Sequence, residues 1–482
     1  MNIRAVTKLI GFLLMVVGVA MVACWSASIY FHEPPSARHG LMWSALITLT
    51  TGVVLRVVCR GPVDLSWRDG IGIGTFGWFF VTVFGALPYI LGGSIPHPVS
   101  ALFESVSGFT TTGASVITVV EPLPKSILLW RAMTHFIGGM GVLVLCVAIL
   151  PFLGVGGMQL YRAEVSGPYK DRLTPRIATT ATLLWGVYTL LCLLCTVLLR
   201  AGGMRWFDAV CHSFAALATG GFSTKTVSIA AYNSLYIEVI LMVFMFLGAT
   251  NFALHYTALR GRFSVYRRDA EFKFYVALWL VACAIVTFNI WHGVYPTLGA
   301  AARNGFFATT SLMTTTGFST GDFDRWPAAS RLTLMLLMVM GGCSGSTAGA
   351  IKQMRVMIVG KLILRRIRLF MHPQAVIQVK LGEQKIEPDV AANVLAFSLL
   401  YLIILAIASF LMTFFTHDII SAASSVIATM GGVGPGLGLV GPLQNYAAIP
   451  AVGKIVLIVC MMLGRLEFYT VLALLLPSFW KK

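Results

Sequence analysis

Long apolar stretches alternate with short polar stretches along nearly the whole chain. Stretches close to the roughly 20 residues that a helix needs to cross a bilayer recur ten times. They begin near Leu9, Gly40, Ile71, Ile127, Ala178, Leu235, Phe272, Leu332, Val390 and Ala448. The pattern predicts an all-α membrane protein of ten spans without an attached soluble domain.

Composition agrees with this class of protein. Of the 482 residues, 57% are hydrophobic and only 11% are charged, whereas soluble domains carry about 25% charged residues. Most of the Lys and Arg residues fall in alternate loops, which predicts that those loops and both termini are cytoplasmic. The net charge of +17 is explained by this topology. Nothing indicates nucleic-acid binding, because no basic patch is interleaved with stacking aromatics on a soluble face.

Four segments between the spans share one plan: a helix too short to cross the membrane, then a turn rich in glycine and hydroxyl residues. They read SALFESVSGFTTTGAS, DAVCHSFAALATGGFS, AARNGFFATTSLMTTTGFS and SAASSVIATMGGVGPG. When Gly113, Gly221, Gly317 and Gly434 are aligned, small residues recur twelve and six positions earlier in each segment. These are Ala101, Ala209, Gly305 and Ala422, then Ser107, Ala215, Ser311 and Ala428. Small residues let a short helix pack closely among its neighbours.

The repeats predict four pseudo-symmetric units of helix, pore loop and helix around one central pore, preceded by two extra N-terminal transmembrane helices. Irregular backbone at membrane depth survives only where protein buries it or where it lines water. The expected division is 1–68 for the helix pair, then 69–160, 161–260, 261–385 and 386–482 for the four repeats.

The four turns, at 110–115, 218–223, 314–319 and 431–436, suggest a selectivity filter. Rings of backbone carbonyls can replace the hydration shell of a monovalent cation, and glycine permits backbone conformations that other residues resist. Threonine hydroxyls could add oxygen ligands or tie each turn to its short helix. The alternative is that glycine and threonine only pack helices together, which explains four turns in register poorly.

These turns, together with WRAMTHFIGGMGVLVLCVAILPFLGVGGMQLYRAE, GGCSGSTAGAIKQMR and MLGRLEFYTVLALLLPSFW, resemble the Trk/Ktr/HKT superfamily of cation transporters. The likeness is closer to its TrkH/TrkI type of bacterial potassium uptake subunit, and it covers nearly the whole chain. It implies potassium ions at a filter made of twelve residues. These are Thr111, Thr112, Gly113, Thr219, Gly220, Gly221, Thr315, Thr316, Gly317, Gly432, Val433 and Gly434. The fourth loop departs from the others because it lacks threonine.

The resemblance also implies partners and a location. Each subunit would contain one pore, subunits would pair as homodimers, and a cytosolic, ring-forming TrkA-type subunit that binds NAD or ATP/ADP would control gating. The chain itself would bind no cofactor beyond potassium. It would lie in the bacterial inner membrane as a multi-pass protein.

A second unusual stretch interrupts the apolar run that begins near Leu332. It comprises Gly341, Gly342, Cys343, Ser344, Gly345, Ser346, Thr347, Ala348, Gly349 and Ala350. A straight helix would not favour four glycines there, because each costs about 1 kcal/mol relative to alanine. We expect a broken helix whose loop crosses the pore below the filter as a gate, as in the family. The alternative is a tight helix crossing through small residues.

Arg465 lies near the middle of the last predicted span. An unpaired charge there costs at least about 2.5 kcal/mol, and Glu467 cannot face it from two positions along the same helix. We expect its partners to be carbonyls of the gate loop, and its charge to repel permeating cations. The alternative is a structural ion pair with no part in conduction.

Several other residues keep more than one interpretation. Glu104 could belong to its short helix or be a charge at the pore mouth, while His135 and His212 are expected to be satisfied buried histidines. The basic segment from Lys352 to Lys385 is explained by topology, although a regulatory ring could dock there.

Two classes of function remain. The first is a channel-like potassium uptake subunit; the second is an ion-coupled symporter using protons or sodium, or a less selective K⁺/Na⁺ transporter. Inverted repeats are usual in secondary transporters, whereas these four repeats share one orientation, which favours the first class. An enzyme is not expected, because the sequence has no metal-ligand cluster, nucleophile elbow or phosphate-binding loop.

Overall fold

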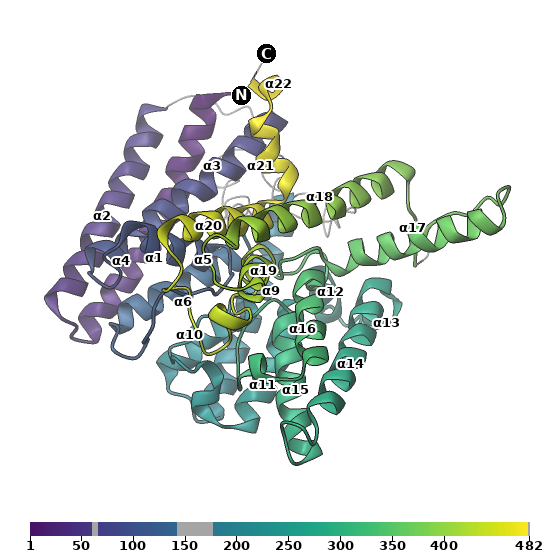
Figure 1. The fold of residues 1–482 in the computed structure, drawn as a ribbon. Helices are drawn as coiled ribbons and strands as arrows, with labels where there is room; N and C mark the ends of the chain where they lie inside the picture. Colours follow the sequence, from purple (N-terminus) through teal and green to yellow (C-terminus); the bar gives the residue numbers. More distant parts are fainter. Residues whose placement is uncertain (60–65, 142–176, 383, 481–482) are drawn as a thin grey trace.

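The computed structural model describes residues 1–59, 66–141, 177–382 and 384–480. These residues form helices, short turns and one two-stranded hairpin, and the predicted all-α class is confirmed (Figure 1). Two features of the sequence analysis lie outside the described residues: the boundary between the first two repeats, and the part of the motif WRAMTHFIGGMGVLVLCVAILPFLGVGGMQLYRAE from residue 142 onwards.

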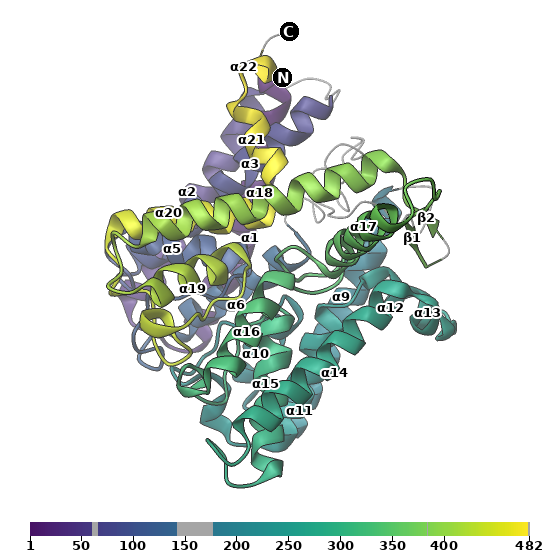
Figure 2. The same ribbon diagram turned by 45° about the vertical axis from the view of Figure 1, so that its right-hand side comes forward.

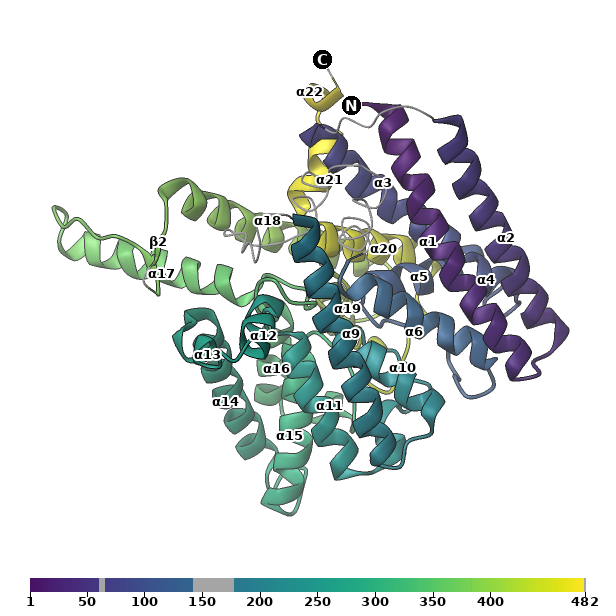
Figure 3. The same cartoon turned by 180° about the vertical axis from the view of Figure 1, so that it is seen from behind.

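The extra N-terminal pair consists of α1 (Ile3–Tyr30) and α2 (Pro35–Val58), which lie along one edge of the molecule (Figure 3). The two helices touch backbone to backbone where they cross. A Cβ atom at Gly11 would lie 2.7 Å from the Gly52 carbonyl oxygen, and one at Gly52 equally close to the Gly11 oxygen. After α1, the buried Glu33 carboxylate accepts the Ser126 backbone N–H at 2.8 Å. That contact fixes the pair to the first repeat.

Four units of outer helix, short pore helix and inner helix follow. The outer helices are α3 (Trp67–Gly85) with its continuation α4 (Leu87–Leu91), α9 (Ile177–Ala201), α14 (Ala270–Ile290) and α18 (Pro388–Met412). The pore helices are α5 (Pro98–Phe109), α10 (Trp206–Leu217), α15 (Leu298–Met313) and α19 (Ile419–Met430). The inner helices begin with α6 (Lys125–Gly139), α11 (Leu235–Gly248), α16 (Ala328–Met340) and α20 (Ala451–Leu466). The C-terminal halves of the pore helices are buried.

Small residues allow the pore helices to pack closely against their neighbours. Ala101, Ala209, Gly305 and Ala422, which share one position in the repeat, are all buried. At Gly305 an added Cβ would lie 2.8 Å from the Thr287 hydroxyl oxygen of α14. The small side chain is therefore what brings α15 and α14 together at this point.

Within the described residues, three inner helices break. The predicted break after α16 is present, and α17 (Gln353–Met371) resumes beyond it. The spans that begin near Leu235 and Ala448 are also broken, by bends that the hydrophobic pattern did not indicate. The chain bends by 103° between α11 and α12 (Phe252–Leu259), and by 113° between α20 and α21 (Phe468–Leu475).

Local chemistry explains both unexpected bends. The Asn251 side chain caps α12 by accepting the Ala253 N–H at 2.9 Å, which starts a new helix in a new direction. Glu467 has a φ of 58°, which lies outside the helical region, so α20 cannot continue through it. In the described ranges six helices are long and apolar enough to cross a membrane, or eight if each bent pair counts as one span.

Helix α17 and the adjoining end of α18 project from the body in Figure 1, and Figure 2 shows the two-stranded hairpin beside α17. The strands β1 (Lys380–Leu381) and β2 (Gln384–Lys385) lie between them in sequence, and Ile358 of α17 packs with Val394 of α18 in a small core. The remaining α-helices of the described residues are α13 (Ser264–Arg268) and α22 (Pro477–Trp480). The start of α1 and the end of α22 lie at the same end of the molecule in Figure 1.

Candidate functional site: a ring of four loops and the segment beneath it

Each pore helix ends in the same backbone motif. The residue after the final turn is left-handed, and the next N–H donates to a carbonyl five residues earlier, so the chain leaves the helix sharply. The left-handed residues are Thr111 (φ 55°), Thr219 (52°), Thr315 (57°) and Gly432 (68°). The accepting carbonyls belong to Ser107, Ala215, Ser311 and Ala428, at 2.8 to 2.9 Å. The second small-residue position of the repeat is therefore the acceptor of this turn.

Two residues further along, each loop turns left-handed again. Gly113, Gly221, Gly317 and Gly434 have φ values of 78°, 77°, 83° and 96°. A β-branched residue is uncommon with positive φ, so three of the four loops hold a strained threonine at the first left-handed position. Strain of this kind persists where the surroundings enforce it, and it clusters at functional sites. The fourth loop has the same backbone with glycine at both positions.

The four loops close into a ring. A Cβ atom at Gly113 would lie 2.0 Å from the carbonyl oxygen of Gly220, and one at Gly221 2.0 Å from that of Thr316. At Gly317 the distance to the Val433 oxygen would be 1.9 Å, and at Gly434 the Thr112 oxygen would be 2.6 Å away. The contacts run from the first loop to the second, third and fourth and back to the first. All twelve residues expected at the filter thus belong to four equivalent loops in contact.

One open face of the ring carries a cavity of about 110 Å³. Gly113, Gly221, Gly317 and Gly434 all line it, together with segments that follow each loop. Some of these segments also tie the loops together: the Tyr446 N–H donates to the Ser115 carbonyl at 2.8 Å, and the Tyr446 hydroxyl to the Gly434 carbonyl at 2.7 Å. Tyr446 therefore joins the first and fourth loops, a role that its sequence position did not indicate.

The threonine hydroxyls make different contacts at the different loop positions. Those of Thr112 and Thr316 hydrogen-bond the hydroxyls of Thr110 and Thr314, each at 2.8 Å. These contacts tie the loop to the end of its pore helix, which is one of the two expected roles. The hydroxyls of the left-handed Thr219 and Thr315 instead contact the loop 341–350 beneath the ring.

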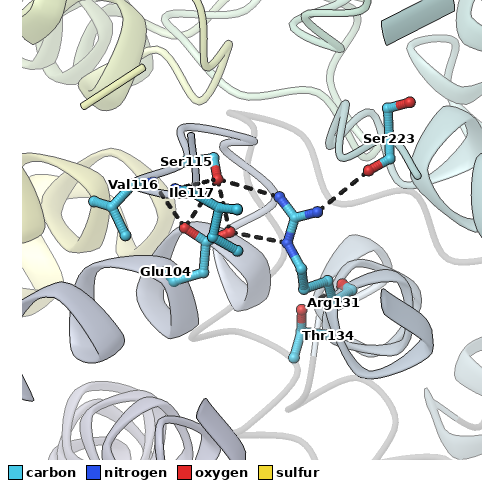
Figure 4. Close-up of polar contacts among 7 residues, drawn as sticks. All are labelled: Glu104, Ser115, Val116, Ile117, Arg131, Thr134 and Ser223. Carbon is cyan, nitrogen blue, oxygen red and sulfur yellow. Dashed lines mark hydrogen bonds and ion pairs between the residues drawn. The ribbon is translucent and has the colours of Figure 1, made fainter. Parts of the chain in front are cut away.

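A buried ion pair supports the first loop from behind (Figure 4). Glu104 of α5 is fully buried and pairs with Arg131 of α6 at 2.9 Å. The carboxylate also accepts the Ser115 hydroxyl and the Val116 N–H, while the guanidinium donates to the Ser223 carbonyl of the second loop at 3.2 Å. Glu104 is therefore not a charge at the pore mouth. Its partner was detectable, because opposite charges in one membrane repeat are expected to pair.

The two buried histidines differ. His212 of α10 has partners for both ring nitrogens, the Asp208 carbonyl at 2.7 Å and the Ser223 hydroxyl at 2.9 Å, and its prediction is confirmed. Neither ring nitrogen of His135 finds a hydrogen-bond partner in the part of the chain that the structure describes. Its ring stacks on Phe222 with centroids 4.2 Å apart and lies against Gly220. The expectation that His135 has hydrogen-bond partners is therefore wrong, because aromatic stacking and close packing surround its ring instead.

The segment from Gly341 to Ala350, which we call the gate loop, packs directly against the ring. The Gly349 N–H donates to the Thr315 hydroxyl at 2.9 Å, and an added Cβ at Gly349 would lie 2.3 Å from the Gly431 carbonyl oxygen. The Thr347 hydroxyl lies 2.9 Å from the Leu217 carbonyl, at the end of α10. Three of the four loops or their helices are therefore in contact with the gate loop.

Arg465 lies at the end of α20 and bonds to backbone carbonyls. One guanidinium nitrogen donates to the Thr347 carbonyl of the gate loop at 3.0 Å. The other donates to Gly139 at 2.8 Å and also to Gly138, at the end of α6. Glu467 pairs instead with Arg355 of α17 at 2.7 Å. The arginine thus bridges the gate loop and the inner helix of the first repeat.

This architecture defines the protein class: a membrane protein in which four repeats of one chain place four pore loops around a single axis. A family model for TrkH, described as a cation transport protein, matches residues 45–482. The chain belongs to this family of cation transport proteins.

Named relatives resemble the chain over its full length. It is 40% identical to the Trk system potassium uptake protein TrkH of Halomonas elongata and 37% identical to that of Escherichia coli K12, covering 100% of each chain. The crystal structure of the potassium transporter TrkH from Vibrio parahaemolyticus superposes with a TM-score of 0.89, at 33% identity and full coverage of both chains. These relatives are transport proteins rather than enzymes, in line with the sequence-based expectation.

The ring contacts predict the effect of enlarging its glycines. Replacing Gly113, Gly221 or Gly317 with serine would place a Cβ about 2 Å from a neighbouring carbonyl oxygen. We therefore expect the permeability ratio of potassium to sodium to fall towards one. In Gly434→Ser the nearest carbonyl oxygen is further from the Cβ position, at 2.6 Å, so the ratio should fall less. The measurement is the permeability ratio in proteoliposomes.

Gly93→Ser is the matched control. Gly93 also has positive φ, at 71°, but nothing lies within 4 Å of its Cβ position. Its variant should keep the wild-type ratio. Unchanged ratios in all four ring variants would show that these glycines do not form a filter.

The buried ion pair predicts a large loss of stability from Arg131→Ala. Removing one partner leaves Glu104 charged and buried, at a cost of about 3 to 5 kcal/mol. A thermal unfolding experiment in detergent measures it. Arg325→Ala, which breaks an exposed pair with Asp322, serves as control and should leave the melting temperature near wild type. Equal melting temperatures for the two variants would contradict the bracing role.

Proposed function

We propose that this chain takes up potassium across the bacterial inner membrane through a channel-like pore. The observation that carries the proposal is the closed ring of four loops with the same alternation of left-handed residues. Such a ring can present equivalent carbonyl oxygens to one dehydrated cation. The named relatives are potassium uptake proteins, which supports potassium as the ion.

The oxygen ligands in this proposal include the carbonyls of Thr112, Gly220, Thr316 and Val433. They occupy one position of the repeat, and each lies against the glycine of a neighbouring loop. Because backbone rather than hydroxyl oxygens form this layer, the missing threonine in the fourth loop leaves the layer complete. Labelled rubidium uptake into proteoliposomes tests the proposal: unlabelled potassium should compete strongly and sodium weakly. Equal competition by the two ions would favour a less selective transporter.

The gate loop is the proposed barrier to flow. Its contacts with Thr315, with Gly431 and with the end of α10 support this role, because none of its residues lines the open cavity on the other side of the loops. Arg465 supports this arrangement in two ways: it holds the Thr347 carbonyl, and its positive charge lies close to the route of a cation. Both effects keep the resting pathway closed.

Regulation and assembly follow from the family resemblance. We place both termini in the cytoplasm, with homodimers and a TrkA-type ring subunit that binds NAD or ATP/ADP. The exposed side chains of α17 suit the docking of a cytosolic partner, since Phe370 is 87% exposed beside several arginines. The connection of α17 to the gate loop would carry the signal.

Deletion of Gly345–Gly349 tests the gate directly. The obstacle would be removed while the four ring loops remain, so basal rubidium flux should rise well above wild type. A single symmetric peak in size-exclusion chromatography is the control that the protein carrying the deletion is folded. Intact protein with background flux would contradict the gate assignment.

Substitutions of Arg465 separate its charge from its hydrogen bonds. Arg465→Ala removes both and should raise flux. Arg465→Lys keeps the charge but cannot span three carbonyls with a planar fork. If electrostatic repulsion by Arg465 dominates, the flux through the lysine variant stays low. If its hydrogen bonds to the carbonyls dominate, the lysine variant conducts as fast as the alanine variant. A stable alanine variant no faster than wild type would refute both roles.

A further inference from the structure

The gate loop is seated in the bend between α11 and α12. A broken helix leaves backbone groups without partners, and in a membrane these must be satisfied by other protein groups. The Cys343 N–H donates to the Ala249 carbonyl at 2.8 Å, and the Thr347 N–H to the Gly248 carbonyl at 3.2 Å. In return, the Phe252 N–H donates to the Gly345 carbonyl at 3.1 Å. Two broken inner helices thus exchange their missing hydrogen bonds.

Glu271, in the first turn of α14, contacts the gate loop at the place where the loop packs into this bend. The side chain is 3% exposed, and its Oε1 accepts two backbone N–H groups, from Ser344 at 2.7 Å and from Met354 at 2.9 Å. Ser344 belongs to the gate loop, whereas Met354 lies in the first turn of α17. One carboxylate oxygen therefore joins the two sides of the break in the third inner helix.

Two donors on one buried oxygen make this contact costly to break. A buried polar group is unfavourable unless it is hydrogen-bonded, and a buried donor or acceptor left without a partner carries its full desolvation penalty. Among the described residues Glu271 has no cation within ion-pair distance. The Ser344 and Met354 N–H groups are accordingly its principal partners, and a movement of the gate loop that broke these hydrogen bonds would leave buried polar groups without partners.

We propose that Glu271 is a positioning residue that latches the gate loop in its closed arrangement. The proposal rests on the proposed function of that loop as the gate. Glu271 also links the loop to the cytoplasmic side, because α14 follows directly on α13 and the basic residues Arg267 and Arg268. A displacement of this α13–α14 corner would carry the carboxylate away from Ser344 and Met354 and release the loop.

The test uses full-length purified protein in liposomes and compares four variants for basal rubidium flux, K⁺/Na⁺ permeability ratio and melting temperature. Glu271→Leu removes the acceptor, and flux should rise about ten-fold, the factor expected when two buried N–H groups lose their acceptor. Glu271→Gln keeps one oxygen, which is a weaker acceptor than a carboxylate, so its flux should rise less. Both should retain the wild-type permeability ratio, which a general loosening of the fold would not preserve.

Two further variants separate the possible failures. Glu238→Gln alters a buried carboxylate of α11 that pairs with Arg303, away from the gate loop, and should leave flux unchanged. The Gly345–Gly349 deletion reports whether the loop is a gate at all. If the deletion fails to raise flux, the proposed gate is wrong and the latch is overturned with it.

If the Gly345–Gly349 deletion raises flux but Glu271→Leu keeps wild-type flux, the loop is a gate and only the proposed role of Glu271 is overturned. If the leucine variant does not fold, the isosteric glutamine variant decides: wild-type flux in that protein overturns the proposal, and raised flux at an unchanged ratio supports it. A rise in flux accompanied by loss of selectivity also overturns it, because the effect would then come from the ring.

Discussion

Backbone groups that leave a helix at membrane depth need protein partners, and this requirement organises the centre of the molecule. Each pore helix satisfies its own end with a turn that returns an N–H to a carbonyl five residues earlier. The carbonyls at the end of α6 are taken by Arg465, and those at the end of α11 by the gate loop. The ring and the segment beneath it are therefore parts of one hydrogen-bonded arrangement.

The same backbone is supported differently in each repeat. A salt bridge between Glu104 and Arg131 braces the first loop, whereas His212 braces the second through Ser223. In the third, the Ser311 hydroxyl donates to the Phe318 carbonyl at 2.7 Å, and in the fourth Ser424 bonds the Leu437 backbone. Selection for one loop conformation is compatible with varied side chains behind it, because a buried turn needs satisfied partners rather than particular residues.

Much of this arrangement could be predicted from the sequence. The class, the four repeats and the break after α16 follow from hydrophobic periodicity and from glycine in apolar surroundings, which are local signals. The bends at Asn251 and Glu467 could not be predicted, because an asparagine cap and one left-handed glutamate leave little trace in composition. The contacts of Glu271 and Tyr446 were missed because they join segments far apart in sequence. Which partner a buried side chain meets depends on how the repeats close around the axis.

The central claim is that ions pass through the ring along their own electrochemical gradient. Its most direct test is the reversal potential of currents through the purified gate-loop deletion in planar bilayers, with opposed potassium and proton gradients. If ions pass through the ring without coupling, the current reverses at the potassium equilibrium potential. This reversal potential should not change when the proton or sodium gradient is changed. A reversal potential that shifts with either of those gradients would contradict a channel-like pore and identify coupled transport.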